Sequence, residues 1–105
     1  MSSRNSVGSL GFLIMLSIDF EDRYLAEIVD LLEGAGHEVT SQACYASLQR
    51  LERLEYVESV KVPRPGSPPV RSYSLTAAGL KESDRWLAIV EHLSQCKTTQ
   101  ETTND

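Results

Sequence analysis

The sequence predicts a small α+β protein that is mostly helical and forms about one domain. Apolar residues recur at helical spacing in four segments, which predicts four helices. Between the third and fourth of these, one stretch alternates with period two and leads into a proline-rich turn, which predicts a β-hairpin. With 105 residues, 41% of them hydrophobic, the chain can bury one small core, and a second copy would add buried apolar area.

Three helices are expected before the hairpin. The first covers about 7–18 and is apolar on most sides, so it should be buried by several neighbours. The second covers about 22–35 and ends at Gly34-Ala35-Gly36, where glycine accepts a left-handed conformation. The third, 41–54, is capped by Thr40 or Ser41. Its core-facing positions recur at helical spacing: Cys44, Leu48, Leu51 and Leu54.

The hairpin and a last helix complete the predicted order. Residues 56–62 alternate as a strand, 63–69 hold four prolines and read as a turn, and 70–75 pair back. Three helices followed by a β-hairpin make a winged helix-turn-helix, in which the third helix presents its outer face. The predicted organisation is a flexible N-terminus (1–6), a winged-helix domain (7–75), a C-terminal helix (76–96) and a disordered polar tail (97–105).

The charge is unevenly distributed along the chain. The net charge is −5, but residues 40–75 carry five basic and three acidic groups, a net +2. This middle third contains the third helix and the wing, so cations gather where a winged helix would meet a polyanion.

The sequence resembles the PadR family of bacterial transcriptional regulators over about residues 9–93. The matching pieces are LGFLIML at 10–16, RYLAEI at 23–28, YASLQRLE at 45–52 and YSLTAAG at 73–79. In that family the third helix reads like LYPALxRLE and the strand after the wing ends in YYxLTxxG. Here Ala46 replaces the proline, and Val70-Arg71 keeps one charge of the usual basic pair. The single C-terminal helix is similar to that of short-form members, which dimerise through it.

The third helix and the wing supply the candidate DNA-binding residues. A helix in the major groove needs hydrogen-bonding side chains in its N-terminal half and cations toward the backbone. A glutamine can meet adenine with two hydrogen bonds, and a wing arginine can enter a narrow minor groove. The candidates are Ser41, Gln42, Tyr45, Gln49, Arg50 and Arg53 on helix 41–54, and Lys61, Arg64 and Arg71 in or beside wing 62–71.

The last helix carries an apolar stripe that is too wide for one small core and predicts a homodimer seam. The stripe consists of Trp86, Leu87, Ile89, Val90 and Leu93. In some short PadR-like regulators an aromatic residue on this helix stacks a flat ligand between subunits, so the resemblance implies a possible small aromatic effector at Trp86. Structural packing is the alternative role for Trp86.

Other chemistries lack support. The two cysteines cannot build a disulfide framework, which favours a reducing cytoplasm. Cys44 is expected in the core. Whether Cys96 forms an intersubunit disulfide is left open. The apolar run before Asp19 is too short to span a membrane. No metal-ligand spacing, nucleophile motif or nucleotide fingerprint occurs, so we expect no enzyme, no metal and no cofactor.

The expected function is therefore a sequence-specific regulator of transcription, acting as a homodimeric repressor on a pseudo-palindromic operator in double-stranded DNA. The alternative is a winged helix that has lost DNA binding and docks another protein through the acidic face of its second helix. The sparse wing charge and the net charge of −5 keep that alternative open.

Overall fold

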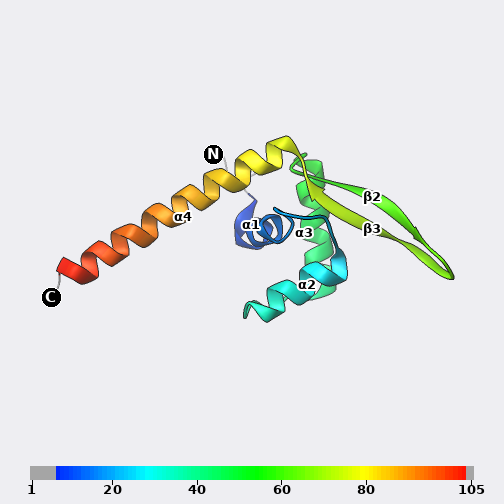
Figure 1. The fold of residues 1–105 in the computed structure, drawn as a ribbon, viewed down its shortest axis with the longest axis horizontal. Helices are drawn as coiled ribbons and strands as arrows, with labels where there is room; N and C mark the ends of the chain where they lie inside the picture. The colour runs from blue at the N-terminus through cyan, green and yellow to red at the C-terminus, as the bar shows by residue number, and fades with distance from the viewer. Residues whose placement is uncertain (1–6, 104–105) are drawn as a thin grey trace.

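The computed structural model describes residues 7–103 and confirms a winged helix-turn-helix of the α+β class (Figure 1). Four helices and three strands follow one another along the chain. Their bounds are α1 (Gly8–Ser17), β1 (Arg23–Tyr24), α2 (Leu25–Gly34), α3 (Ser41–Arg53), β2 (Val57–Arg64), β3 (Ser67–Leu75) and α4 (Ala77–Thr103). The expectation of a flexible 1–6 segment lies outside the described residues.

Helix α1 is the centre of the core. It contacts α2, α3 and α4, which explains why its apolar residues surround the helix instead of forming one stripe. Ile14 and Met15 are fully buried, and three predicted core residues of α3 join them: Cys44, Leu48 and Leu51. Leu54, the C-cap residue that follows α3, is half-buried and packs against this core.

The second helix starts later than the sequence predicted. Instead of beginning at 22, α2 begins at Leu25, because Arg23 and Tyr24 form a short strand beside the centre of β3. The backbone N–H of Tyr24 donates to Glu27 Oε1 at 2.9 Å, which closes the start of the helix. The sheet therefore has three strands in the order β1-β3-β2 instead of the two expected.

The two strands of the wing are longer than predicted, and its turn is shorter. The expected turn at 63–69 contracts to Pro65-Gly66, where Gly66 takes φ +69, a conformation that glycine adopts at little cost. The other three prolines of the segment lie inside β2 and β3, yet none of them has a Cα partner in the register. A proline has no N–H to donate to the neighbouring strand. The irregular register between Val62 and Arg64 leaves these positions outside the regular pairing, so proline is tolerated there.

The junction between the wing and α4 is tightly built. Helix α3 ends in a Schellman motif: Glu55 takes φ +66, and the N–H of Tyr56 donates to the Leu51 carbonyl at 3.0 Å. Thr76 Oγ1 donates to the Glu55 carbonyl at 2.7 Å and accepts from the N–H of Gly79 at 3.0 Å. A Cβ on Gly79 would overlap the carbonyl oxygen of Tyr56.

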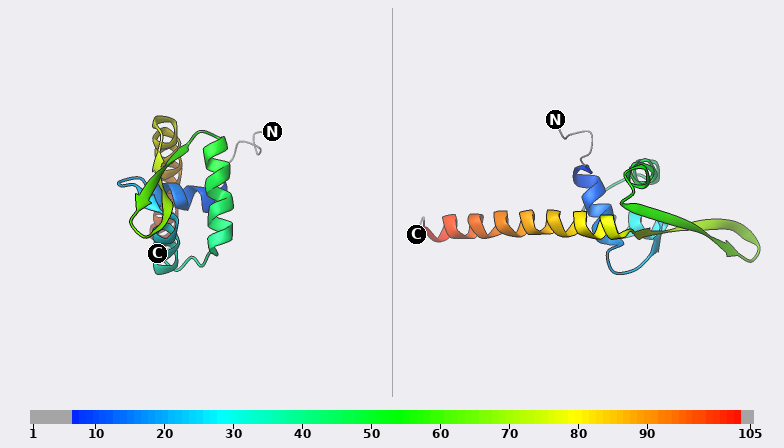
Figure 2. Two further views of the ribbon diagram at one scale, coloured as in Figure 1. Left: turned by 90° about the vertical axis from the view of Figure 1, so that its right-hand side faces the viewer. Right: turned by 90° about the horizontal axis from the view of Figure 1, so that it is seen from above.

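Helix α4 continues past the predicted end at 96. It reaches Thr103, so the segment from 97 that was expected to be a disordered tail is helical up to that residue. No proline or glycine follows Gly79, and nothing in the local sequence therefore stops the helix. Its outer half projects from the body on the side away from the wing (Figure 1, and Figure 2, right), which stretches the molecule to 62 × 31 × 22 Å.

Candidate nucleic-acid interface

The exposed face of α3 carries the residues that the sequence singled out. Burial of Cys44, Leu48 and Leu51 turns the opposite side of the helix outward. The Thr40 side chain accepts from the N–H of Ala43 at 3.0 Å and caps the first turn. All six predicted helix residues are exposed: Ser41, Gln42, Tyr45, Gln49, Arg50 and Arg53.

Two of these polar side chains order each other. Gln49 Nε2 donates to the Tyr45 hydroxyl at 3.1 Å across one turn of α3. The pair occupies the middle of the exposed face, and the hydrogen bond restricts the rotamers of both side chains before any ligand arrives. The arrangement presents an aromatic ring and an amide carbonyl side by side.

The three predicted wing cations are also exposed. Lys61 on β2 lies directly opposite Arg71 on β3. Arg64 is the last residue of β2, next to the turn. Arg71 Nη1 donates to Ser59 Oγ at 3.0 Å. Ser59 Oγ in turn donates to Glu52 Oε2 at 2.8 Å. The wing is thus tied to the last turns of α3 by a chain of two side-chain hydrogen bonds.

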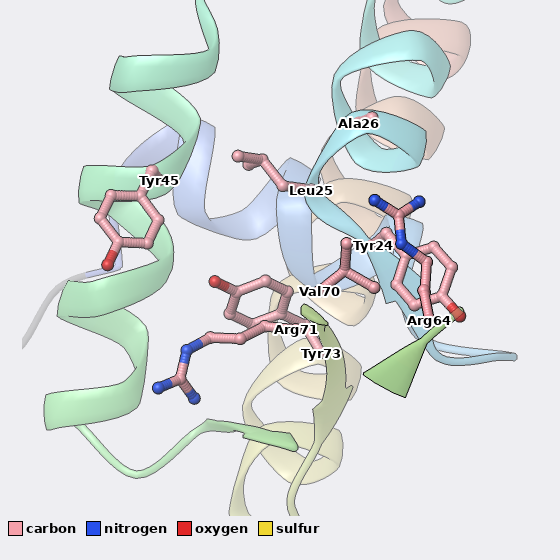
Figure 3. Close-up of a pocket in the computed structure, with 8 residues that line it drawn as sticks. All are labelled: Tyr24, Leu25, Ala26, Tyr45, Arg64, Val70, Arg71 and Tyr73. Carbon is pink, nitrogen blue, oxygen red and sulfur yellow. The ribbon is translucent and has the colours of Figure 1, made fainter. Parts of the chain in front are cut away.

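A groove of about 460 Å³ lies between α3, the start of α2 and the wing (Figure 3). It brings together three of the predicted residues: Tyr45 from α3, with Arg64 and Arg71 from the wing. The other six candidates do not line it. The lining that sequence reasoning missed is mostly apolar and aromatic and consists of Tyr24, Leu25, Ala26, Val70 and Tyr73.

Tyr73 forms the inner wall of this groove. It is 2% exposed, and burial, with the nearby carboxylate of Glu52, raises its pKa. The phenol is therefore neutral and able to donate a hydrogen bond at physiological pH. Tyr73 begins the segment YSLTAAG at 73–79, but nothing in the local sequence pattern indicates that its ring faces α3.

The apolar stripe of α4 divides into two parts. Trp86 and Leu87 are half-buried, whereas Ile89, Val90 and Leu93 are 39%, 42% and 60% exposed. This division leaves an uncovered apolar strip on the projecting part of α4.

The indole of Trp86 is engaged by side chains of the same chain. Its ring packs against Phe12 with centroids 5.7 Å apart, and its Nε1 donates to Glu82 Oε2 at 3.0 Å. Arg85 donates to the same carboxylate at 2.8 Å, and these hydrogen bonds lower the pKa of Glu82. The structure thus gives Trp86 the packing role that was one of its two expected roles, and an aromatic effector at this residue stays a prediction.

The two cysteines differ in environment. Cys44 is fully buried, and burial raises the pKa of its thiol to about 11, which confirms it as a core side chain. Cys96 is exposed, with Sγ 3.8 Å from His92 Nε2. Within residues 7–103 no helix is long and apolar enough to cross a membrane. Among the described side chains, no three His, Cys, Asp or Glu residues gather as a metal ion would require.

An exposed polar helix beside a basic wing defines a winged-helix protein of the kind found in transcriptional regulators. Residues 14–85 match the family model described as the transcriptional regulator PadR-like family. The chain therefore belongs to this family, which places it among regulators of transcription and not among enzymes.

Solved structures share the fold. A PadR-like transcription factor from Bacteroides fragilis is 26% identical with a TM-score of 0.80, covering 93% of this chain and 95% of that one. Bacillus subtilis PadR in complex with operator DNA is 16% identical with a TM-score of 0.72, covering 78% of this chain and 48% of that one. A PadR family regulator from Clostridium difficile is 22% identical with a TM-score of 0.69, covering 84% and 97%. A comparison with curated proteins finds no match.

Proposed function

We propose that this protein is a homodimeric, sequence-specific repressor that binds double-stranded DNA with α3 in the major groove and the wing on the backbone or in the minor groove. The observation that carries DNA binding is the groove that brings Tyr45, on the exposed face of α3, together with Arg64 and Arg71 of the wing. Bacillus subtilis PadR, which has the same fold, forms a complex with operator DNA, and this supports DNA as the partner of this protein.

The side chains of α3 fit the two tasks of a reading helix. Gln42 lies in the first turn, where a recognition helix contacts base edges, and its amide suits adenine N6 and N7. Arg50 and Arg53 lie in the last turn, where cations meet phosphates and also complement the helix dipole. Reading and anchoring are thus assigned to opposite ends of α3.

The groove suits a sugar-phosphate strand. Its floor is apolar and aromatic, and the guanidinium groups of Arg64 and Arg71 come from its wing side. Arginine recognises phosphate through several N–H groups in one plane. Because Arg64 stands near the tip of the hairpin, it is our candidate for a minor-groove contact.

The projecting part of α4 supplies the dimer. Ile89, Val90 and Leu93 form an exposed apolar strip, and a second copy packed on it would remove that strip from water. A two-fold dimer would present its two α3 helices to successive major grooves about 34 Å apart, which requires a pseudo-palindromic operator. We expect Leu93→Asp to give monomers in light scattering and to weaken operator binding, whereas a dimer that survives this substitution would contradict the seam.

A salt titration of binding to promoter-length duplexes tests DNA recognition. We expect a steep fall of log K with log salt concentration, since cations that neutralise phosphates release counterions. Arg50→Ala or Arg64→Ala should each reduce the slope by about one. Lys81→Ala is the matched control, because Lys81 is an exposed cation on α4 away from the groove, and it should leave the slope unchanged.

A flat salt response with weak binding would contradict the proposal. It would favour the alternative expected from the sequence, a protein-docking module. The acidic residues of α2 that would form its surface are all exposed: Glu27, Asp30 and Glu33.

A further inference from the structure

The geometry points to Ser59 as a positioning residue that holds the guanidinium of Arg71 in place for a DNA phosphate, with Glu52 as its anchor. This inference rests on the proposed function, because it concerns how the wing engages the groove. Ser59 and Glu52 were not among the residues that the sequence singled out, and neither lines the groove.

Three different elements meet in this contact. Glu52 lies near the end of α3, Ser59 on β2 and Arg71 on β3. The hydroxyl of Ser59 has one proton, which is directed at Glu52 Oε2 at 2.8 Å. Its lone pairs are then free to accept from Arg71 Nη1 at 3.0 Å. The carboxylate of Glu52 thereby orients the hydroxyl of Ser59 so that its oxygen accepts the hydrogen bond from Arg71.

The strand register explains why Arg71 needs an anchor. Lys61 lies directly opposite Arg71 in the hairpin, and like charges at such positions repel each other. A long cationic side chain in this setting would turn away from its neighbour and sample many rotamers. The carboxylate of Glu52, reached through Ser59, draws Arg71 toward α3 and opposes that repulsion.

The held arginine keeps its binding capacity. A guanidinium has five N–H donors in one plane, and the contact with Ser59 uses Nη1. The other nitrogen atoms of the same side chain can donate to a phosphate lying in the groove that Arg71 lines. Because the rotamer is selected before binding, less conformational freedom is lost when the phosphate arrives.

The first experiment measures DNA affinity and its salt dependence for Ser59→Ala and Ser59→Thr. We expect Ser59→Ala to weaken binding by about three- to tenfold, the range that corresponds to ordering one long side chain. Ser59→Thr keeps the hydroxyl and should bind like the wild type. Ser72→Ala is the matched control, because Ser72 precedes Tyr73, the partner of Ser59, and so points to the other face of the hairpin.

The second experiment separates positioning from simple structural support by a double-mutant cycle. If Ser59 acts through Arg71, then Ser59→Ala should cost nothing further in an Arg71→Ala background. Glu52→Gln should also weaken binding and should be non-additive with Ser59→Ala. This variant keeps the test available if Ser59→Ala lowers the unfolding temperature too far.

The outcomes distinguish this inference from the proposed function. A wild type with a flat salt response overturns DNA recognition and the positioning role together. Salt-dependent binding that Ser59→Ala leaves unchanged, or losses that add fully in the Arg71→Ala background, overturn only the positioning role. Failure of Ser59→Thr to bind like the wild type does the same.

Discussion

The close approach of α4 to the root of the wing makes Gly79→Ala the sharpest test of the fold. A Cβ at this position would overlap the carbonyl oxygen of Tyr56 and lie 3.0 Å from its carbonyl carbon and 3.1 Å from Leu75 Cδ2. Backbone cannot move aside as a flexible side chain does. The first turn of α4 must therefore shift, which strains the Thr76 N–H to Tyr56 carbonyl bond at 3.0 Å.

The expected cost follows from these contacts. Overpacking costs about 1–3 kcal/mol, and weakening one or two hydrogen bonds adds about 1 kcal/mol each. We therefore expect Gly79→Ala to lower the free energy of unfolding by about 2–5 kcal/mol, a large share of the stability of a small domain. Urea unfolding at one fixed protein concentration measures this loss, since the stability of the proposed dimer would depend on concentration.

Gly34→Ala is the matched control for this substitution. Gly34 is also helical, but nothing lies within 4 Å of the position its Cβ would take. Alanine there should be neutral or stabilising by about 0.5–1 kcal/mol. Equal unfolding midpoints for the two variants would refute the reasoning, because local helix propensity would then outweigh the close approach.

Four further substitutions and one labelling experiment test other features. Thr40→Ala removes the cap of α3 and should cost about 1 kcal/mol in urea unfolding, whereas an unchanged midpoint would contradict the cap. Glu55 takes a left-handed φ of +66, so Glu55→Gly should raise the free energy of unfolding by about 0.5–1 kcal/mol. A lower urea midpoint for this variant would contradict that expectation. In the native protein at neutral pH, a thiol reagent should modify Cys96 and spare Cys44, as mass spectrometry of the labelled chain would show; rapid labelling of both sites would argue against burial. The pKa of Cys44 is raised from 9.0 to about 11, so its contribution to stability is complete below pH 9 and is lost as pH rises to 11, by up to about 3 kcal/mol. Cys44→Ala should lack that loss in denaturant unfolding at several pH values, while Cys96→Ala should retain it.

The sequence predicted the elements whose signal is periodic. The spacing of Cys44, Leu48 and Leu51 fixes which side of α3 is buried, and the exposed face follows from it. Strand β1 was not predicted, because two residues are too few to show an alternating pattern. Tyr24 also fitted the apolar stripe of the helix that follows. The prolines of the wing suggested a wide turn, since a sequence does not show which backbone N–H groups a register leaves unused.

The site was predictable only in part for a related reason. Charge and helical spacing locate Gln42 and Arg53 on an outer face without reference to any other element. The groove depends on the pairing of β1 with β3, which places Tyr24 beside Ser72. The contact of Ser59 with Glu52 depends on how the hairpin returns to α3, and no local pattern encodes that distance.

The joint formed by Thr76 and Gly79 has a mechanical consequence. Helix α4 leaves this joint in one direction and the hairpin leaves it in nearly the opposite direction (Figure 2, right). At the joint, Thr76 ties the start of α4 to the backbone carbonyls of Glu55 and Tyr56, the two residues that precede β2. In the proposed dimer, a small rotation of one α4 helix against its partner would move the hairpin tip of that subunit through a larger arc, as long as this joint stays rigid.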